Sequence, residues 1–194
     1  PQGDWSSDVC SSDLCRVFPK RASRYAMNAK KTIWSHNTVI PPKMFSCVLP
    51  DVYRSNLFGS ESFSFIESLK LKSIVYLGNE TLDEEWVAFC EESNISVFQI
   101  SDNVVRPKDD WEPISEDSVK RAIEFLSKKA NTPVLVMCKN GVEKTGIVIA
   151  CLRKCHHWCF TSIIQEFRRE AYEEAVQPNA ELFIEFFSPD IVAE

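Results

Sequence analysis

Residues 133–150 read PVLVMCKNGVEKTGIVIA, and this stretch decides the fold class. Its first six residues form the most apolar strand candidate of the chain, and a short polar loop with two glycines follows. A helix is then predicted from Thr145 to Lys154. A buried apolar strand that leads through a short loop into a helix is typical of a parallel sheet covered by helices. In such sheets ligands bind at the carboxyl ends of the strands, so this loop is the first candidate for a functional site.

The rest of the chain alternates predicted strands with predicted helices. Short apolar runs predict further strands at residues 52–54, 73–77 and 96–100. Apolar residues at helical spacing predict helices at residues 60–69, 83–93, 115–129, 161–171 and 179–187, with Ser115, Thr161 and Asn179 as helix caps. The alternation predicts an α/β fold with a central, mostly parallel sheet of about four to five strands flanked by helices. We expect this domain to occupy residues 41–194.

The composition excludes several classes of protein. With 194 residues, of which 44% are hydrophobic, the chain is long and apolar enough for one folded domain. Its formal charge of −6 argues against a general nucleic-acid binder. Its five glycines do not form the G-x-G-x-x-G pattern of dinucleotide-binding domains. The longest apolar runs, 133–138 and 147–152, fall short of the roughly 18 residues that a membrane span needs. We therefore expect no nucleic-acid partner and no membrane span.

The first 40 residues differ from the remainder in charge. Residues 15–40 contain six basic residues and no acid, whereas residues 1–14 contain three aspartates. Ser-Ser-Asp occurs at both 6–8 and 11–13, a repeat that resembles a translated sequencing adapter more than a protein segment. We interpret residues 1–40 as a basic, unfolded leader. The alternatives are an arm that contacts nucleic acid, an acidic partner or a membrane surface, and a mitochondrial presequence.

The cysteines point to a reducing compartment. The chain has eight cysteines and no secretory signal, so a disulfide framework is not expected and the predicted location is the cytoplasm. Cys151, Cys155 and Cys159 are spaced by four, which predicts one helix face. A zinc site within residues 155–159 is the alternative, but it lacks the second ligand pair that zinc sites usually have. The default interpretation is that these thiols pack as small apolar groups.

Two kinds of anion site fit the loop after the strand at 133–138. Gly141 and Gly146 have the spacing of a nucleotide-binding loop, but Ile147 and Val148 stand where that loop needs a lysine and a hydroxyl residue. A nucleoside-triphosphate hydrolase is therefore not expected. The second kind of site uses Cys138, because a thiolate facing a helix N-terminus and free loop N–H groups is a nucleophile suited to phosphorus.

The spacing around Cys138 resembles the C-x5-R-[ST] signature of the protein-tyrosine-phosphatase superfamily, with lysine in place of arginine. Over residues 41–187 the chain resembles the plant and fungal atypical dual-specificity phosphatases. That family includes inositol-pyrophosphate phosphatases and the fungal oxidant-induced cell-cycle-arrest proteins, and the resemblance is closest to this latter branch. The matching segments are residues 41–46, Tyr53-Arg54-Ser55, residues 63–65 and 71–74, the loop 138–146, residues 150–154, Trp158, Ser162-Ile163 and residues 166–169.

The resemblance implies a protein-tyrosine-phosphatase-like fold and assigns roles to individual residues. It implies that Cys138 is the nucleophile, that Lys144 and Thr145 act beside it, and that Asp102 is a candidate general acid. Asp109 and Asp110 are alternatives for the acid. The predicted phosphate-binding residues are Lys139, Asn140, Gly141, Val142, Glu143 and Gly146. Neither a metal nor an organic cofactor is implied, because this chemistry needs only a thiolate, hydrogen-bond donors and an acid.

The chain departs from active members of the family in the loop itself. Met137 replaces a histidine, Val142 and Glu143 replace a basic pair, and Lys144 replaces the arginine. Lysine cannot form the two-pronged contact that arginine makes with phosphate, and losing one such preorganised donor typically costs about 10²-fold to 10³-fold in rate. Glu143 also adds a negative charge beside an anion site.

These departures favour a pseudophosphatase or a regulatory subunit in a stress or cell-cycle response. The alternative is an active Cys-dependent phosphatase that acts on phosphotyrosine or inositol pyrophosphates through a cysteinyl-phosphate intermediate. The expected ligands are a phosphorylated protein or an inositol pyrophosphate. By resemblance, a hetero-complex with related family members is a further expectation.

Overall fold

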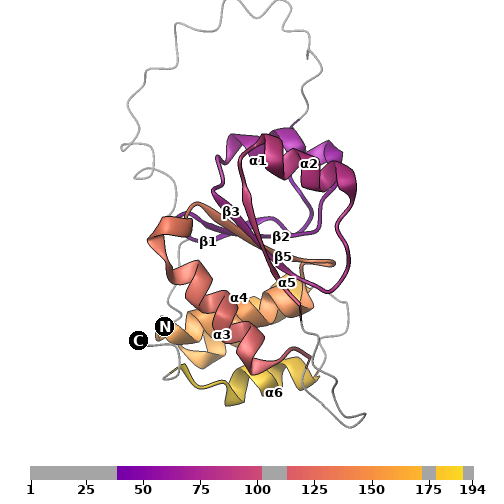
Figure 1. Cartoon of the computed structure of the whole chain (residues 1–194). Helices are drawn as coiled ribbons and strands as arrows, with labels where there is room; N and C mark the ends of the chain where they lie inside the picture. The colour runs from indigo at the N-terminus through magenta and orange to yellow at the C-terminus, as the bar shows by residue number, and fades with distance from the viewer. Residues whose placement is uncertain (1–38, 102–112, 172–177, 190–194) are drawn as a thin grey trace, which may run out of the picture. The chain divides into compact units, whose positions relative to one another are not determined.

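The computed structural model describes residues 39–101, 113–171 and 178–189. The strands are β1 (Ser46–Leu49), β2 (Val52–Asn56), β3 (Ser73–Leu77), β4 (Ser96–Ile100) and β5 (Val134–Cys138). The α-helices are α1 (Phe63–Ser68), α2 (Glu84–Glu92), α3 (Glu116–Ser127), α4 (Glu143–Cys155), α5 (Phe160–Ala171) and α6 (Pro178–Phe186), and two short 3₁₀ helices cover Ser60–Ser62 and Lys129–Asn131. Figure 1 shows the sheet with helices on both faces. The predicted α/β class is confirmed.

The five strands form one sheet in the order β1-β2-β5-β3-β4. β1 pairs antiparallel with β2, and the other neighbours are parallel, which confirms the mostly parallel sheet. β5 lies between β2 and β3, with Asn56 opposite Cys138 and Tyr76 opposite Met137. The carboxyl ends of these three strands therefore meet at one edge of the sheet. The loop after β5 begins at that edge.

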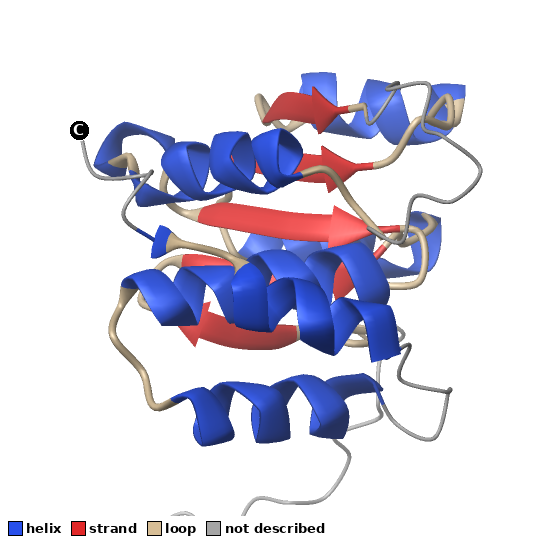
Figure 2. Ribbon diagram, turned by 90° about the horizontal axis from the view of Figure 1, so that it is seen from below, coloured by secondary structure: helices blue, strands red, loops and turns tan. Residues whose placement is uncertain are grey.

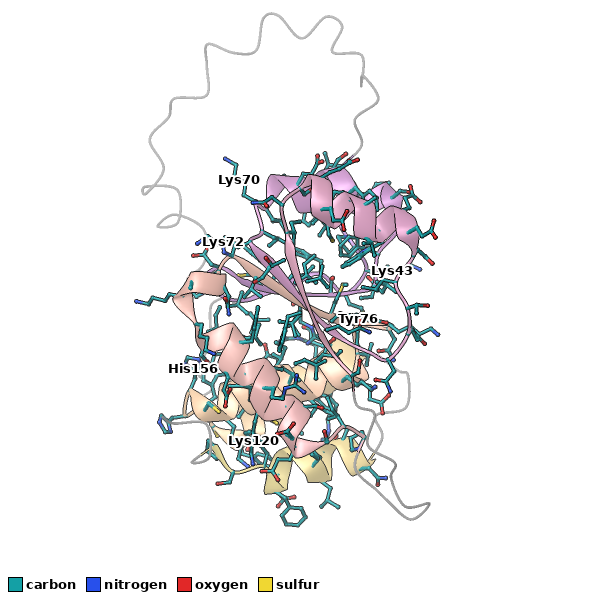
Figure 3. The ribbon with its side chains drawn as sticks, in the orientation of Figure 1. Lys43, Lys70, Lys72, Tyr76, Lys120 and His156 are labelled. Carbon is teal, nitrogen blue, oxygen red and sulfur yellow. The ribbon has the colours of Figure 1, made fainter. Side chains whose placement is uncertain are left out.

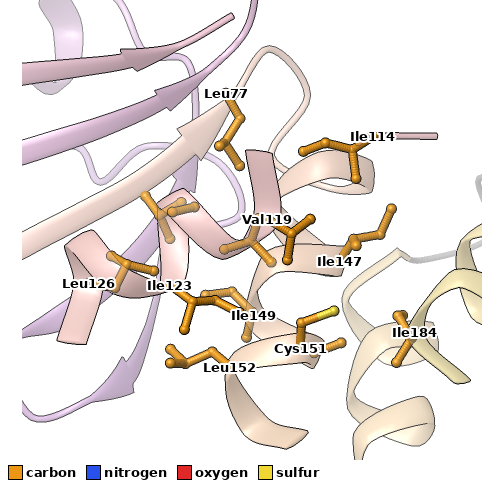
Figure 4. Packing of buried hydrophobic residues seen from close by; sticks show 14 of the residues in the cluster. Leu77, Ile114, Val119, Ile123, Leu126, Ile147, Ile149, Cys151, Leu152 and Ile184 are labelled. Carbon is orange, nitrogen blue, oxygen red and sulfur yellow. The ribbon is translucent and has the colours of Figure 1, made fainter. Parts of the chain in front are cut away.

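Helices cover the two faces of the sheet unequally. α1 and α2 lie on one face, and α3 to α6 lie on the other (Figure 1). Seen from below in Figure 2, the larger group of helices lies in front of the strands. Each face has its own apolar cluster, and Figure 4 shows part of the larger one, where residues of α3 and α4 meet the sheet. Because side chains alternate along β5, Met137 belongs to the smaller cluster and Cys138 to the larger.

Several predicted element boundaries needed correction. The sequence analysis missed β1, which pairs with β2 across a turn in which Asp51 has a φ of 63°. α4 begins at Glu143, two residues before the predicted start at Thr145. Its helical hydrogen bonds begin at the Val142 carbonyl, which accepts from the Gly146 N–H. This earlier start matters for the site, because it brings the helix N-terminus closer to Cys138.

The predicted N-terminal caps of α5 and α6 are also wrong. α5 begins at Phe160, and the carbonyl of Cys159, not Thr161, accepts the first hydrogen bonds. α6 begins at Pro178, a residue suited to the first helical position because it has no N–H to leave unsatisfied, so Asn179 lies inside the helix. α4 ends at Cys155, and Cys159 therefore does not share a helix face with Cys151 and Cys155 as predicted.

Some predictions concern residues outside the described ranges. The candidate acids Asp102, Asp109 and Asp110 fall there, as does almost all of the predicted leader at 1–40. The division into a leader and a domain of residues 41–194 therefore stays a prediction. Within the described ranges, no helix combines the length and the apolar character needed to span a membrane.

Candidate functional site

Cys138 ends the central strand and lies at the floor of a cavity. The residue is 3% exposed. The cavity has a volume of about 390 Å³ and opens at the edge where β3 and β5 end. Its walls come from the end of β3, the loop after it, the loop after β5 and the start of α4: residues 76–80, 138–140, 143 and 144. The structure thus brings Cys138, Lys139, Asn140, Glu143 and Lys144 together around one cavity, and their roles in binding and catalysis stay predictions.

Gly141 gives the loop after β5 its shape. Its φ is +72°, a backbone conformation that residues with a side chain rarely adopt. A Cβ at this position would lie 2.7 Å from the Asn56 backbone nitrogen and 2.8 Å from the Asn56 Cα. The loop therefore crosses directly over the end of β2, and only glycine fits this approach.

Gly146 allows α4 to pack closely on α5. A Cβ on Gly146 would lie 2.8 Å from Cε2 of Phe167, a buried residue of α5. This packing fixes the N-terminus of α4 relative to the sheet. Gly146 itself does not line the cavity, so its predicted role in phosphate binding stays a prediction.

A single amide oxygen bridges the thiol and the loop backbone. Asn140 Oδ1 accepts a hydrogen bond from the Cys138 thiol at 3.2 Å and another from the Val142 N–H at 3.0 Å. The thiol is thus a donor in this arrangement, and one loop N–H is already satisfied from within the loop. The Asn140 oxygen occupies the position of an acceptor in front of the sulfur, which is where an anion would sit.

An ion pair forms the rim of the cavity on the β3 side. Lys139 Nζ lies 2.8 Å from Glu80 Oε1, and the Tyr76 hydroxyl donates to Glu80 Oε2 at 3.3 Å. Gln99 Nε2 donates to the Glu80 carbonyl at 3.2 Å, which ties the Glu80 backbone to β4. The hydrogen bond from Lys139 lowers the pKa of Glu80, while burial and the Glu80 carboxylate raise the pKa of Tyr76 to about 12. Figure 3 labels Tyr76 near this end of β3 and Lys72 near the opposite end.

The charged side chains of the cavity cancel one another. Glu80 and Glu143 are acidic, and Lys139 and Lys144 are basic. Lys139 already pairs with Glu80. Lys144 has no ion pair within 4 Å among the described residues and is the basic group left for an incoming anion. The cavity therefore lacks the strong positive field that an anion-binding loop normally presents.

Thr145 makes no side-chain hydrogen bond to Cys138. Its side chain is fully buried in the first turn of α4, and Oγ1 has no hydrogen-bond partner within the described residues. Arg54 Nε and Asn56 Oδ1 are two further buried polar atoms without a partner there. Arg54 and Asn56 both border the loop, because Arg54 bonds to Gly141 and Asn56 lies against it. Unsatisfied buried polar groups cost about 1–3 kcal/mol each, and none of these three residues is among those that line the cavity.

Arg54 is a residue of the site that the sequence analysis did not single out. It lies on β2, is 2% exposed, and donates from Nη2 to the Gly141 carbonyl at 2.8 Å. Burial lowers the pKa of this guanidinium, and the charges of Glu170, Cys138 and Glu166 oppose that effect. The signal in the sequence was a basic residue inside a short strand; its contact is 87 residues away and could not be read from spacing.

The described residues contain no cluster of three or more His, Cys, Asp or Glu side chains arranged to hold a metal ion. The zinc alternative at residues 155–159 has no such cluster behind it among these residues. The chemistry available in the cavity is that of a thiol, backbone N–H groups, a helix N-terminus and one unpaired lysine.

Comparison with known proteins finds relatives and a solved structure that are named as phosphatases. The protein named "Putative tyrosine-protein phosphatase OCA1" of Mycosarcoma maydis is 34% identical over 154 residues, which are 79% of this chain and 96% of that protein. Inositol diphosphatase DSP3 of Arabidopsis thaliana is 37% identical over 138 residues, 70% of this chain and 67% of its own. The solved core catalytic domain of the PP-IP phosphatase SIW14 from S. cerevisiae superposes with a TM-score of 0.72 at 35% identity, covering 80% of this chain and 91% of that one. Residues 39–194 match the family described as the tyrosine phosphatase family, and the chain belongs to that family.

Proposed function

We propose that this chain is a phosphatase-family protein that binds a phosphorylated ligand at the Cys138 loop and turns it over poorly, as a pseudophosphatase or regulatory subunit. The observation that carries the proposal is the Asn140 bridge between the Cys138 thiol and the Val142 N–H, in a loop where Lys144 replaces arginine. The proposed ligand is a phosphorylated protein or an inositol pyrophosphate, the latter because relatives at about this identity are named for inositol diphosphatase activity.

Ligand binding is supported by the geometry of the loop. The N-terminus of α4 and the loop N–H groups supply partial positive charge, which favours anions. The Asn140 oxygen is a neutral acceptor, and a phosphate oxygen carrying charge forms a stronger hydrogen bond to the same N–H.

Poor turnover is supported by the charges and by the state of the thiol. Phosphoryl transfer depends almost entirely on positioning and on stabilising the charge that develops on the transferred group. Lys144 offers a point charge on a flexible chain in place of a fixed fork, and Glu143 adds repulsion at the first residue of α4. The Asn140 oxygen also lies 3.2 Å from the Cys138 sulfur, where it competes with an incoming phosphate group.

An active Cys-dependent phosphatase is the second candidate, and the position of Cys138 favours it. The sulfur lies at the floor of an open cavity beneath a loop that Gly141 shapes. In that mechanism the thiolate attacks phosphorus, the leaving oxygen departs with a proton from an acid, and water then releases inorganic phosphate. The acid that the sequence analysis favours, Asp102, belongs to the segment that the structure does not describe.

The wider biology is also part of the proposal. Resemblance to the fungal oxidant-induced cell-cycle-arrest branch favours a role in a stress or cell-cycle response, a cytoplasmic location, and a hetero-complex with related family members. A low-turnover subunit in such a complex would contribute ligand binding and leave catalysis to its partner.

Phosphate release by the full chain tests the proposal. The substrates are an aryl phosphate and an inositol pyrophosphate, assayed beside Cys138→Ser, with ligand binding measured by calorimetry. We expect binding of the inositol pyrophosphate together with phosphate release equal to, or only slightly above, that of Cys138→Ser. Robust release that depends on Cys138 would instead establish the active enzyme, and the absence of both binding and release would reject both candidates.

A further inference from the structure

Arg54 is a charged side chain in an unusual place. It lies on a strand next to the central one, is 2% exposed, and its one hydrogen bond to a described residue goes to the Gly141 carbonyl, at 2.8 Å. Nε has no partner among the described residues. Burying a guanidinium with so few partners is costly unless it serves a nearby group. The neighbouring group is the loop that carries the candidate site.

The contact with Gly141 sets the direction of a peptide group. A trans peptide is planar, and its C=O and N–H point in opposite directions. The carbonyl of the Gly141–Val142 peptide points to Arg54 beneath the loop, and its N–H points to Asn140 Oδ1. Asn140 lines the cavity, so this N–H faces the cavity side of the loop. Arg54 thus holds the peptide in the orientation that an anion acceptor needs.

Besides Arg54, the elements around Cys138 contribute other charged or titratable side chains. Lys139, Glu143 and Lys144 belong to the loop and the start of α4, and Glu80 and Tyr76 belong to β3 and the loop after it. Because Lys139 pairs with Glu80, and Glu143 opposes Lys144, the front of the cavity has little net charge. Arg54 approaches from behind, where Glu166 and Glu170 of α5 act on it.

We propose that Arg54 is the positioning residue of this site: it fixes the Gly141–Val142 peptide with its N–H toward the cavity, and its charge favours a thiolate or a bound oxyanion at Cys138. The proposal rests on the proposed function, since it names the residue that keeps the degenerate loop competent for anions. Arg54 acts through the loop backbone and does not touch the ligand.

The test measures the alkylation rate of Cys138 by iodoacetamide across pH 5 to 10, read by mass spectrometry on the full chain. Arg54→Met removes the charge and the hydrogen bond at similar length. We expect the alkylation rate of Cys138 in Arg54→Met to fall about tenfold at neutral pH. The rate–pH curve should move toward higher pH by about one pH unit, because a stabilising positive charge is lost. Arg54→Lys keeps the charge and is expected to lie between Arg54→Met and the unchanged protein.

The matched control is Arg153→Met, which removes the other buried arginine of the described residues. Arg153 is 5% exposed, pairs with Glu166 at 3.0 Å and stacks on Trp158, away from the loop. We expect this control to be destabilised but to move the Cys138 curve less than Arg54→Met does, because Arg153 reaches Arg54 only through Glu166. A curve for folded Arg54→Met that coincides with that of the unchanged protein would overturn the proposal. If Arg54→Met does not fold, a coincident curve for Arg54→Lys would do so.

The two proposals fail in different ways. Orthovanadate binding by the unchanged protein reports on the proposed function, whereas the alkylation curves report on Arg54 with no ligand present. If vanadate binds and the curves coincide, the ligand site stands and the role of Arg54 is rejected. If vanadate does not bind and the Arg54→Met curve moves, the positioning role stands and the ligand proposal is rejected.

Discussion

Restoring the loop to the pattern of active family members should restore catalysis. The variant combines Val142→Lys, Glu143→His and Lys144→Arg and leaves Cys138 and Gly141 unchanged. The structure supports this design because Glu143 and Lys144 already line the cavity beside Cys138, and because the glycine that shapes the loop is present. The substitutions therefore change charge and hydrogen bonding without requiring a new backbone path.

The size of the gain follows from two contributions. Lys144→Arg supplies a two-pronged donor, which is typically worth about 10²-fold to 10³-fold in rate. The other two substitutions add two positive charges to a cavity whose charges now cancel. In an open, solvated cavity each charge is worth about 1 kcal/mol at contact distance, so the pair adds about thirtyfold. We expect kcat/KM for an aryl phosphate to rise by about 3 × 10³-fold to 3 × 10⁴-fold.

The assay compares initial rates of the triple variant, the unchanged protein and the triple variant with Cys138→Ser. Activity of the triple variant must disappear with Cys138→Ser, because the gain is assigned to nucleophilic attack by that sulfur. If the triple variant folds, binds phosphate and still shows less than about a tenfold gain, charge and donor chemistry are not the missing parts. That result would refute the reasoning and place the defect in the loop geometry or in the acid.

Three further predictions follow from single contacts. Gly141→Ala forces a side chain into a φ of +72° and against the Asn56 backbone, so urea unfolding should show a loss of about 2–4 kcal/mol; a loss below about 0.5 kcal/mol would contradict the close crossing. Glu80→Gln frees Lys139 from its ion pair and should tighten phosphate binding about fivefold in calorimetry. The control Glu67→Gln, at the opposite end of the sheet, should leave binding unchanged, and equal effects of the two variants would show that the ion pair does not hold Lys139 away from the anion. Hydrogen bonds from the Thr161 and Ser162 N–H groups lower the pKa of exposed Cys159, whereas burial raises the pKa of Cys151. Iodoacetamide at neutral pH should therefore modify Cys159 before Cys151, and equal rates for the two in the folded protein would contradict this.

Local sequence patterns predicted most of the parallel strands well. The predicted strands at 73–77 and 96–100 coincide with β3 and β4, because β3 is a fully buried apolar run and β4 ends at a polar segment. β1 was missed because its four residues are too short a run to show a clear strand pattern. Its formation depends on pairing with β2 across the turn at Asp51, whose φ of 63° an aspartate tolerates. Such a hairpin is set by tertiary pairing more than by propensity.

Part of the candidate site could likewise be predicted from the sequence, and part of it could not. Cys138 and the glycines could be found because the strand, loop and helix that carry them are contiguous in sequence. The Asn140 bridge and the role of Arg54 could not be found from sequence. They depend on the directions of side chains and on a contact between residues that are 87 positions apart. The charge balance of the cavity also needed the structure, since Glu80 reaches Lys139 from a loop 59 residues away.

A crystal of the full chain soaked in orthovanadate would show whether the Cys138 loop still binds an anion. We expect vanadate bound to the Cys138 sulfur, with its oxygens accepting from the Val142 N–H and the Asn140 side chain displaced. An unchanged bridge from Asn140 to Cys138 and Val142, with the cavity free of vanadate at saturating concentration, would contradict it.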